Sequence, residues 1–353
     1  MKICRSIICL FCLVGFSCQS KPDLSEDRGN EITPAGELDA PQEMVWSKAG
    51  DEVFYLSLPP NGQYAVRARN ITTKAARLID GRNRQYAALT LSHDGSKLFY
   101  LAHDYQARDL GLFRISTDGL NLERLIGNVK TLFPPVQPSF VLSSDEIHLA
   151  YVAEASDSLF VYNLVDKSGT FLAHGSPMTF SPDGKQLLYA ESREGSPSSD
   201  HFIFSPGTGA KQPISFGLDP QRQHLYLTRW DGDGIRIFYR GEDVRFYFVR
   251  DVTTGTVSKV WEQDYGVPIS PHFSWSPDGS RISAWTSKCL VSRGFLDCEV
   301  TQFSLHVINA NGQNARVIAY GNDNGGATAF FSDGKQIAYS FGFKMYVRSI
   351  TSN

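Results

Sequence analysis

The sequence lacks the features that mark several large classes of protein. Its longest apolar stretch, residues 7–16, is about ten residues long, too short for a helix that crosses a bilayer. The 34 Lys and Arg do not outnumber the 37 Asp and Glu, which argues against a nucleic-acid partner. No Gly-x-Ser-x-Gly motif occurs, so we expect no serine-hydrolase site. No stretch of ten or more residues has the 3.6-residue apolar period of a helix.

Cysteine is scarce outside the first 18 residues. That start has a short basic region with Lys2 and Arg5, then the apolar stretch, then small residues before Cys18. It resembles a lipoprotein signal, in which the cysteine becomes the lipid-carrying first residue after cleavage. We therefore expect a signal peptide at 1–17 and, at 18–40, lipidated Cys18 followed by a flexible polar tether. Plain secretion and a chance apolar start are the alternatives.

The two remaining cysteines, Cys289 and Cys298, have eight residues between them. An even pair in an exported protein predicts a disulfide, here across a hairpin. The alternative is two free buried thiols. The spacing does not fit a CxxC metal or redox motif.

A repeated turn dominates residues 41–353. A Ser-x-Asp-Gly turn followed by an apolar strand recurs, most clearly in LSHDGSKLFYLA, FSPDGKQLLYA, WSPDGSRISAW and FSDGKQIAYS. With three degenerate copies, the Ser or Thr before each turn falls at 47, 92, 143, 181, 228, 276 and 332. The spacings of 38 to 56 residues are those of propeller blades.

The turn motif has a structural explanation. Asp accepts nearby backbone hydrogen bonds, and Gly adopts the positive φ that a side chain resists. We therefore interpret the motif residues as structural: Asp94, Gly95, Asp183, Gly184, Asp278, Gly279, Asp333 and Gly334.

These repeats predict an all-β fold, a β-propeller of four-stranded blades. Seven turns favour seven blades, and six remain the alternative if one degenerate copy is not a blade. Only two strands follow the last turn, so we expect residues 31–38 to supply the outer strand that closes the ring.

FSPDGKQLLYA and WSPDGSRISAW resemble the repeats of the TolB-like, PD40 (WD40-like) propeller family, and the resemblance covers about residues 43–350. It implies a propeller, and it leaves the function open because propellers host many functions.

Two histidines are the best candidates for a ligand site. His224 and His272 each stand four residues before a repeat anchor, at the start of the innermost strands of adjacent blades. Both imidazoles could converge on one mouth of the central channel and, with a third ligand, hold a divalent metal. The simpler interpretation is two solvated loop histidines and no cofactor.

The sequence therefore favours a non-enzymatic function. We expect a monomeric binding or scaffold propeller in the bacterial cell envelope, on the periplasmic face or the cell surface, which contacts the membrane through its lipid alone. Its expected partner is an envelope protein or a glycan. The alternative is a metal-dependent propeller enzyme of the lyase, cyclotransferase or lactonase type, acting at the channel mouth.

Overall fold

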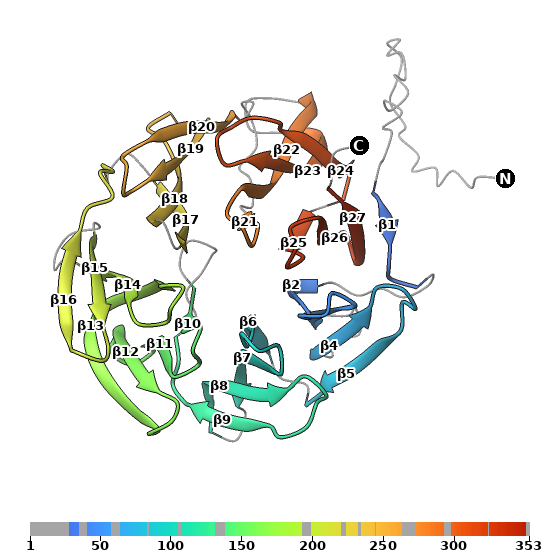
Figure 1. Cartoon of the computed structure of the whole chain (residues 1–353). Helices are drawn as coiled ribbons and strands as arrows, with labels where there is room; N and C mark the ends of the chain where they lie inside the picture. Colours follow the sequence, from blue (N-terminus) through green and yellow to red (C-terminus); the bar gives the residue numbers. More distant parts are fainter. Residues whose placement is uncertain are drawn as a thin grey trace, which may run out of the picture.

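The computed structural model describes residues 28–34, 41–57, 64–82, 85–104, 107–130, 138–192, 199–219, 224–231, 234–243, 245–262, 273–292, 298–323 and 325–350. These residues form 27 β-strands and no helix, so the all-β prediction is confirmed. The sheets stand around a central axis as a β-propeller (Figure 1).

Five of the sheets have four antiparallel strands each, and a sixth has seven. Two of the four-stranded sheets are β2 (Pro41–Trp46), β3 (Glu52–Ser57), β4 (Ala65–Asn70) and β5 (Ala76–Asp80), and β6 (Tyr86–Leu91), β7 (Lys97–Asp104), β8 (Asp109–Ser116) and β9 (Glu123–Ile126). Two more are β17 (His224–Asp231), β18 (Gly234–Arg240), β19 (Phe246–Asp251) and β20 (Val257–Glu262), and β21 (Phe273–Trp275), β22 (Arg281–Ser292), β23 (Cys298–Asn309) and β24 (Arg316–Gly321).

The seven-stranded sheet consists of two four-stranded units that share one strand. Its strands are β10 (Phe140–Leu142), β11 (His148–Ala153), β12 (Ser158–Asn163), β13 (Ser168–Phe180), β14 (Leu187–Ser192), β15 (Ser199–Ser205) and β16 (Ala210–Ile214). The first half of β13 pairs with β12 and the second half with β14. The long strand β13 is thus the outer strand of one unit and the inner strand of the next.

The fifth four-stranded sheet closes the ring with both ends of the chain. It contains β25 (Gly325–Phe330), β26 (Gln336–Phe341), β27 (Lys344–Ser349) and β1 (Asn30–Glu31), and we call it the closing sheet. The antiparallel register places Asn30 opposite Val347 and Glu31 opposite Tyr346. The outer strand therefore overlaps the expected 31–38 segment only at its start, and residues 35–40 lie outside the described residues.

The side chains around β1 hold it firmly. Ile32 is only 3% exposed, and the backbone N–H of Met345 donates to Thr33 Oγ1 at 2.8 Å. Lys344 forms an ion pair with Glu31 at 2.7 Å. This short strand covers the edge of β27, which would otherwise be open to pairing with another chain.

The core lies between neighbouring sheets. Each apolar cluster draws its buried residues mainly from two adjacent sheets, as where Phe54 and Val66 meet Leu98 and Phe113. The second strand of most sheets carries a buried tyrosine at the same repeat position, as in Tyr55, Tyr100, Tyr151, Tyr189, Tyr239 and Tyr339. Sheets buried on both faces explain why the strand sequences are almost continuously apolar.

Hydrogen bonds within the repeat turn set its shape. In the turn at Asp94, Ser92 Oγ donates to the Asp94 carboxylate at 2.7 Å and the Ser96 N–H donates to it at 2.8 Å. These bonds, that from Ser92 above all, lower the pKa of Asp94 to about 2. Gly95 has φ +80°, which explains the glycine.

Two repeats depart from the positions that the sequence indicated. In the last repeat, Phe331 occupies the anchor position expected for Ser332, because its backbone bonds to Gln336 and Gly334 match those of the serine in other turns. The Phe331 ring fills the space next to Gly50 and packs 5.1 Å from Trp46. The anchor there is one residue earlier than we expected.

In the fifth repeat, the strands continue past the expected anchor at Thr228. Thr228 pairs with Ile237 in mid-strand, and the ladder runs on to Asp231 opposite Gly234. The sequence shows no Ser-x-Asp-Gly turn here because a longer hairpin replaces it.

Candidate functional site

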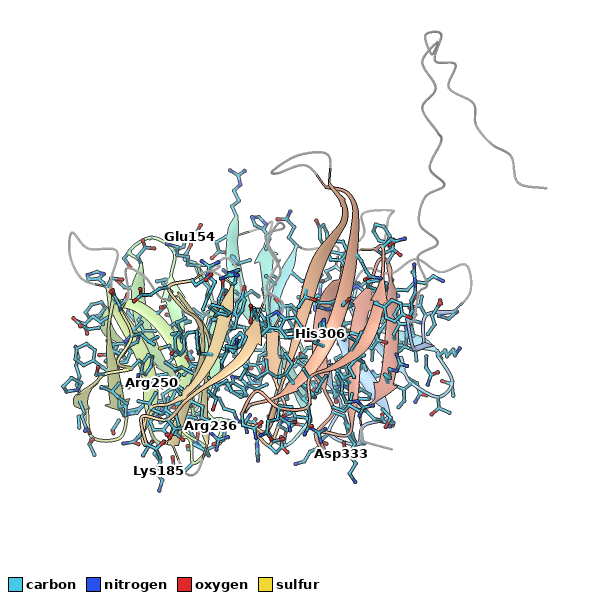
Figure 2. All side chains as sticks on the ribbon, turned by 90° about the horizontal axis from the view of Figure 1, so that it is seen from above. Glu154, Lys185, Arg236, Arg250, His306 and Asp333 are labelled. Atoms are coloured by element: carbon cyan, nitrogen blue, oxygen red, sulfur yellow. The ribbon has the colours of Figure 1, made fainter. Side chains whose placement is uncertain are left out.

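The propeller has two unlike faces. The repeat turns lie on one of them, where Figure 2 labels Lys185 and Asp333, and we call this the turn face. Glu154 lies on the opposite face, from which β22 and β23 project as a long hairpin (Figure 2). We call this second face the arm face.

Contacts between successive turns stabilise the turn face. Two contacts run from one turn to a carbonyl of the next, Lys48 Nζ to His93 at 3.2 Å and Ser144 Oγ to Pro182 at 2.7 Å. From the long hairpin of the fifth repeat, Arg229 in β17 donates to the Ser276 carbonyl at 3.0 Å. Arg281 reaches Gly334 in the same way at 3.3 Å. Four side chains of this face thus bond to the neighbouring repeat.

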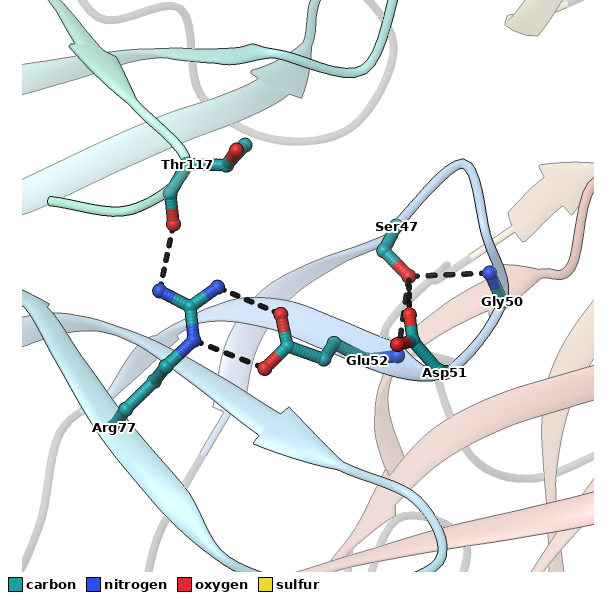
Figure 3. A network of polar contacts seen from close by, with 6 residues as sticks. All are labelled: Ser47, Gly50, Asp51, Glu52, Arg77 and Thr117. Carbon is teal, nitrogen blue, oxygen red and sulfur yellow. Dashed lines mark hydrogen bonds and ion pairs between the residues drawn. The ribbon is translucent and has the colours of Figure 1, made fainter.

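The first turn and its neighbour show how this face is built (Figure 3). Ser47 Oγ donates to Asp51 at 2.9 Å and accepts from the Gly50 and Glu52 N–H groups. On the next strands, Arg77 forms a bidentate pair with Glu52 and donates to the Thr117 carbonyl at 2.7 Å. Since Thr117 belongs to the following sheet, the guanidinium joins two sheets.

One of the two predicted channel-mouth histidines begins a strand at the arm face. His224 is the first residue of β17, opposite Arg240, so its backbone lies at the arm-face end of an inner strand. His272 lies outside the described residues, directly before Phe273 at the start of β21. Because β17 and β21 are inner strands in contact, the described residues His224 and Phe273 begin neighbouring inner strands. Nothing described of the His224 side chain tests whether it points to the channel.

The inner strands bring polar groups near the channel that the sequence did not single out. Glu43 in β2 reaches across to β6 and accepts the N–H groups of Ala88 and Leu89 at 2.9 and 2.7 Å. Burial raises its pKa against the lowering effect of these two bonds. Ala88 sits at a β-bulge with φ +52°, and this irregularity, invisible in sequence, points both N–H groups at the carboxylate.

A second polar group consists of three hydroxyls between the sheets of β21 and β25. Ser274 lies 2.7 Å from Ser283, and both lie 3.0 Å from Thr328. Each hydroxyl can donate to one neighbour and accept from the other, so the cluster satisfies itself. None of its hydrogen-bond partners is a basic group that could activate a hydroxyl as a nucleophile. We therefore interpret the cluster as a structural link between two sheets.

A hollow of about 500 Å³ lies at the arm-face edge of β8 and β9. Asp109, Arg124 and Asn128 supply its polar lining. Arg124 Nη2 lies 2.6 Å from both Asp109 carboxylate oxygens, and the Asn128 N–H donates to the same carboxylate at 2.7 Å. The charges therefore balance each other, and the hollow carries no net charge to select a ligand.

The described residues contain no cluster of three or more His, Cys, Asp or Glu that could hold a metal ion. His174, close to the expected edge by sequence, is exposed and lies 3.3 Å from Ser158 Oγ. No described helix is long and apolar enough to cross a membrane.

The predicted covalent sites stay predictions. Cys18 lies outside the described residues. In the β22–β23 hairpin, Cys289 pairs with Thr301 and Cys298 with Ser292, so the cysteines are three register positions apart, about 10 Å along the ribbon. A disulfide needs Cα atoms within about 7 Å, so the predicted bond requires a different register at the tip.

Comparison with known proteins gives the fold. No family model and no curated protein matches the chain. An oligogalacturonate lyase from Vibrio parahaemolyticus aligns with a TM-score of 0.65 at 11% identity, over 91% of this chain and 93% of that one. An oligogalacturonate lyase in complex with manganese aligns at 0.64 and 14%, with the same coverage. TolB from Acinetobacter baumannii aligns at 0.52 and 13%, over 85% of this chain and 66% of that one. At such identities the likeness shows a shared fold and leaves the function to the chain's own residues.

Proposed function

We propose that this chain is a lipid-anchored binding propeller of the bacterial cell envelope whose arm face receives a protein or glycan partner. The difference between the two faces carries this proposal. The turn face uses its polar groups in turn-to-turn bonds, as where Lys48 and Arg281 reach the next turn. A rigid base of this kind suits a scaffold that presents variable connections on its other side.

The arm face offers what a binding surface needs. The connections from an outer strand to the next inner strand lie on this face with Glu154, as does the connection at Phe343, which is 55% exposed. Exposed aromatic residues are enriched where proteins bind partners. TolB from Acinetobacter baumannii shares the fold.

Site-specific photocrosslinking in intact cells tests the proposal. A crosslinking amino acid at Glu154 or Phe343 reports on the arm face, and one at Lys185 or Val165, both exposed, reports on the turn face. We expect discrete adducts from the arm-face positions and none from the turn-face controls. Adducts restricted to the turn face, or none from any position, contradict the proposal.

The second candidate function is a metal-dependent lyase acting at the channel mouth. The fold shared with an oligogalacturonate lyase in complex with manganese, together with the placement of His224 on the arm-face end of β17, favours it over other enzymes. His224 and His272 would contribute ligands, and the metal would act as a Lewis acid when bound.

This candidate is tested by incubating the protein with oligogalacturonate and manganese and measuring unsaturated product. Product formed by the parent and lost in the His224→Ala/His272→Ala variant supports the lyase. Equal background from both proteins removes it.

A further inference from the structure

The outer strands of the sheets form the rim of the ring (Figure 1). The free edge of an outer strand can pair with a strand of another chain, and proteins protect such edges with charged residues or proline. Six of the seven described outer strands carry this protection: Glu31 in β1, Arg77 in β5, Glu123 and Arg124 in β9, Lys211 and Pro213 in β16, Lys259 and Glu262 in β20, and Arg316 in β24.

The first half of β13 is the exception. Residues 168–174, which we call the β13 edge, read SGTFLAH and contain no Asp, Glu, Lys, Arg or Pro. Their regular part runs from Ser168 opposite Asn163 to Phe171 opposite Phe160, and it ends at a bulge of the kind that four other outer strands also have. Among the described strands, the β13 edge pairs with β12 alone. Its outer side is therefore an unprotected strand edge.

The side chains of the β13 edge are open to solvent. The regular part, from Ser168 to Phe171, is exposed at every position, and Phe171 itself is 52% exposed. The Phe171 ring is nevertheless held on the sheet, because its centroid lies 5.9 Å from that of Phe160 and 5.5 Å from that of His174. A fixed, exposed aromatic ring beside a free edge is the kind of group that cross-strand pairing buries.

The sequence of the β13 edge fits a second copy of itself. Two identical strands can pair antiparallel about a two-fold axis, which brings each residue near the axis close to its own counterpart. A charged residue such as Lys259 in β20 would then meet a like charge, whereas the β13 edge has no charged residue to repel its counterpart. With the axis at Thr170, Phe171 of each copy stands opposite Gly169 of the other, so the ring covers a residue that has no side chain.

We propose that two copies of this chain associate through the β13 edge, so that β13 of one ring and β13 of the other join in one antiparallel sheet. The inference depends neither on the lipid anchor nor on the arm-face site, and it departs from the expectation of a monomer. Because the contact uses the same edge of both rings, association stops at two copies. One strand pair buries less than the roughly 1,600 Å² of a standard interface, so we expect micromolar affinity.

Sedimentation equilibrium of the purified protein tests the inference. The chain from residue 19 onward, which contains every described residue, is measured from roughly 1 to 300 µM, a range that spans micromolar affinity. Two variants, Thr170→Lys and Thr170→Glu, place a charge at the centre of the β13 edge. The matched control is Gln212→Lys, which adds the same charge at an exposed position of the protected strand β16.

We expect the average mass of the parent and of the Gln212→Lys control to rise with concentration from one chain to two. Thr170→Lys and Thr170→Glu should each weaken association roughly tenfold or more, because two like charges then meet at the axis. An equimolar mixture of these two variants should restore the dimer, since opposite charges face each other. Recovery in the mixture shows that neither variant is misfolded.

The full chain is tested in intact cells with a crosslinking amino acid at Thr170. Two copies that carry different tags should be joined in one adduct of twice the chain mass. This adduct is distinct from those of a partner at Glu154 or Phe343, so failure of either proposal is seen separately.

Four results overturn the inference. A parent that stays monomeric at the highest concentration shows that the edge does not pair. A mass that keeps rising beyond two chains shows open-ended assembly. Equal association of the parent and Thr170→Lys places the contact on another surface. An adduct at Thr170 that contains a different protein assigns the β13 edge to a strand of a partner.

Discussion

His306 is an unusual residue because burial lowers the pKa of its imidazole to about 4. It lies in β23 with Nε2 3.0 Å from Thr286 Oγ1 and its ring centroid 4.3 Å from that of Trp261. Trp261 belongs to the preceding sheet, so a neutral imidazole is packed between sheets. Nothing in the local sequence distinguishes it from a surface histidine.

This packing predicts a pH dependence of stability. Between pH 6.5 and 4 the unfolded chain binds the proton at position 306 and the folded chain does not, so stability falls as the pH falls through this window. The loss is at most about 3 kcal/mol and ends near pH 4, where both states are protonated. His306→Gln should lose less stability between pH 7 and 4.5 in urea unfolding. An equal loss in parent and variant would show that His306 does not titrate on unfolding.

At the residue scale, sequence reasoning found positions defined by the repeat and missed those defined by packing. Asp94 and Gly95 could be predicted because their roles follow from local turn chemistry. Glu43 could not, because its carboxylate depends on a bulge in the next sheet. His224 begins β17, as the sequence indicated, although the turn from which we counted is absent in this repeat and the role of His224 stays a prediction.

The repeat turn is the element that joins sequence and fold most directly. In the turn at Asp278, burial raises the carboxyl pKa, but hydrogen bonds from Ser276 and Ser280 outweigh it and hold the pKa at about 2. Asp278→Ala removes these acceptors, and we expect a loss of about 1–2 kcal/mol in the free energy of unfolding.

The control for this turn is Lys185→Ala, which removes an exposed side chain on the same face. It should change the free energy of unfolding by less than about 0.5 kcal/mol. Equal effects of the two substitutions would mean that the Asp278 hydrogen bonds add nothing to stability.

The closing strand makes a second element-scale prediction. Ile32 is buried against the closing sheet, so Ile32→Ala should cost about 2–4 kcal/mol in denaturant unfolding. Glu31→Ala, which removes the partly exposed ion pair with Lys344, should cost less than about 1 kcal/mol. If Ile32→Ala is as mild as Glu31→Ala, residues 28–33 are not an integral part of the ring.

At the scale of strands and turns, the repeat pattern predicts which elements occur but not their bounds. The missing outer strand could be predicted by counting strands after the last turn, but its start at Asn30 depends on side chains such as Ile32 that fit β27. The long hairpin in place of the fifth turn, and the shift of the last anchor to Phe331, depend on contacts with other sheets.

For the whole molecule, the regular spacing of the repeat turns was enough to predict the propeller fold. Turns spaced by about one blade imply stacked sheets, because each sheet must bury its apolar faces against the next. The unlike character of the two faces was not predictable, since it arises from contacts between turns and from the length of β22 and β23. The function that we propose rests on that asymmetry rather than on a catalytic motif.

The central claim, a binding propeller rather than a metal enzyme, is tested most directly by thermal unfolding. The domain, made without Cys18, is melted with divalent metals, chelator, glycans and peptidoglycan fragments beside the His224→Ala/His272→Ala variant. The account predicts that no metal and no chelator moves the parent's melting temperature relative to the variant's. A metal that raises the melting temperature of the parent by several degrees, and leaves the variant unchanged, contradicts it.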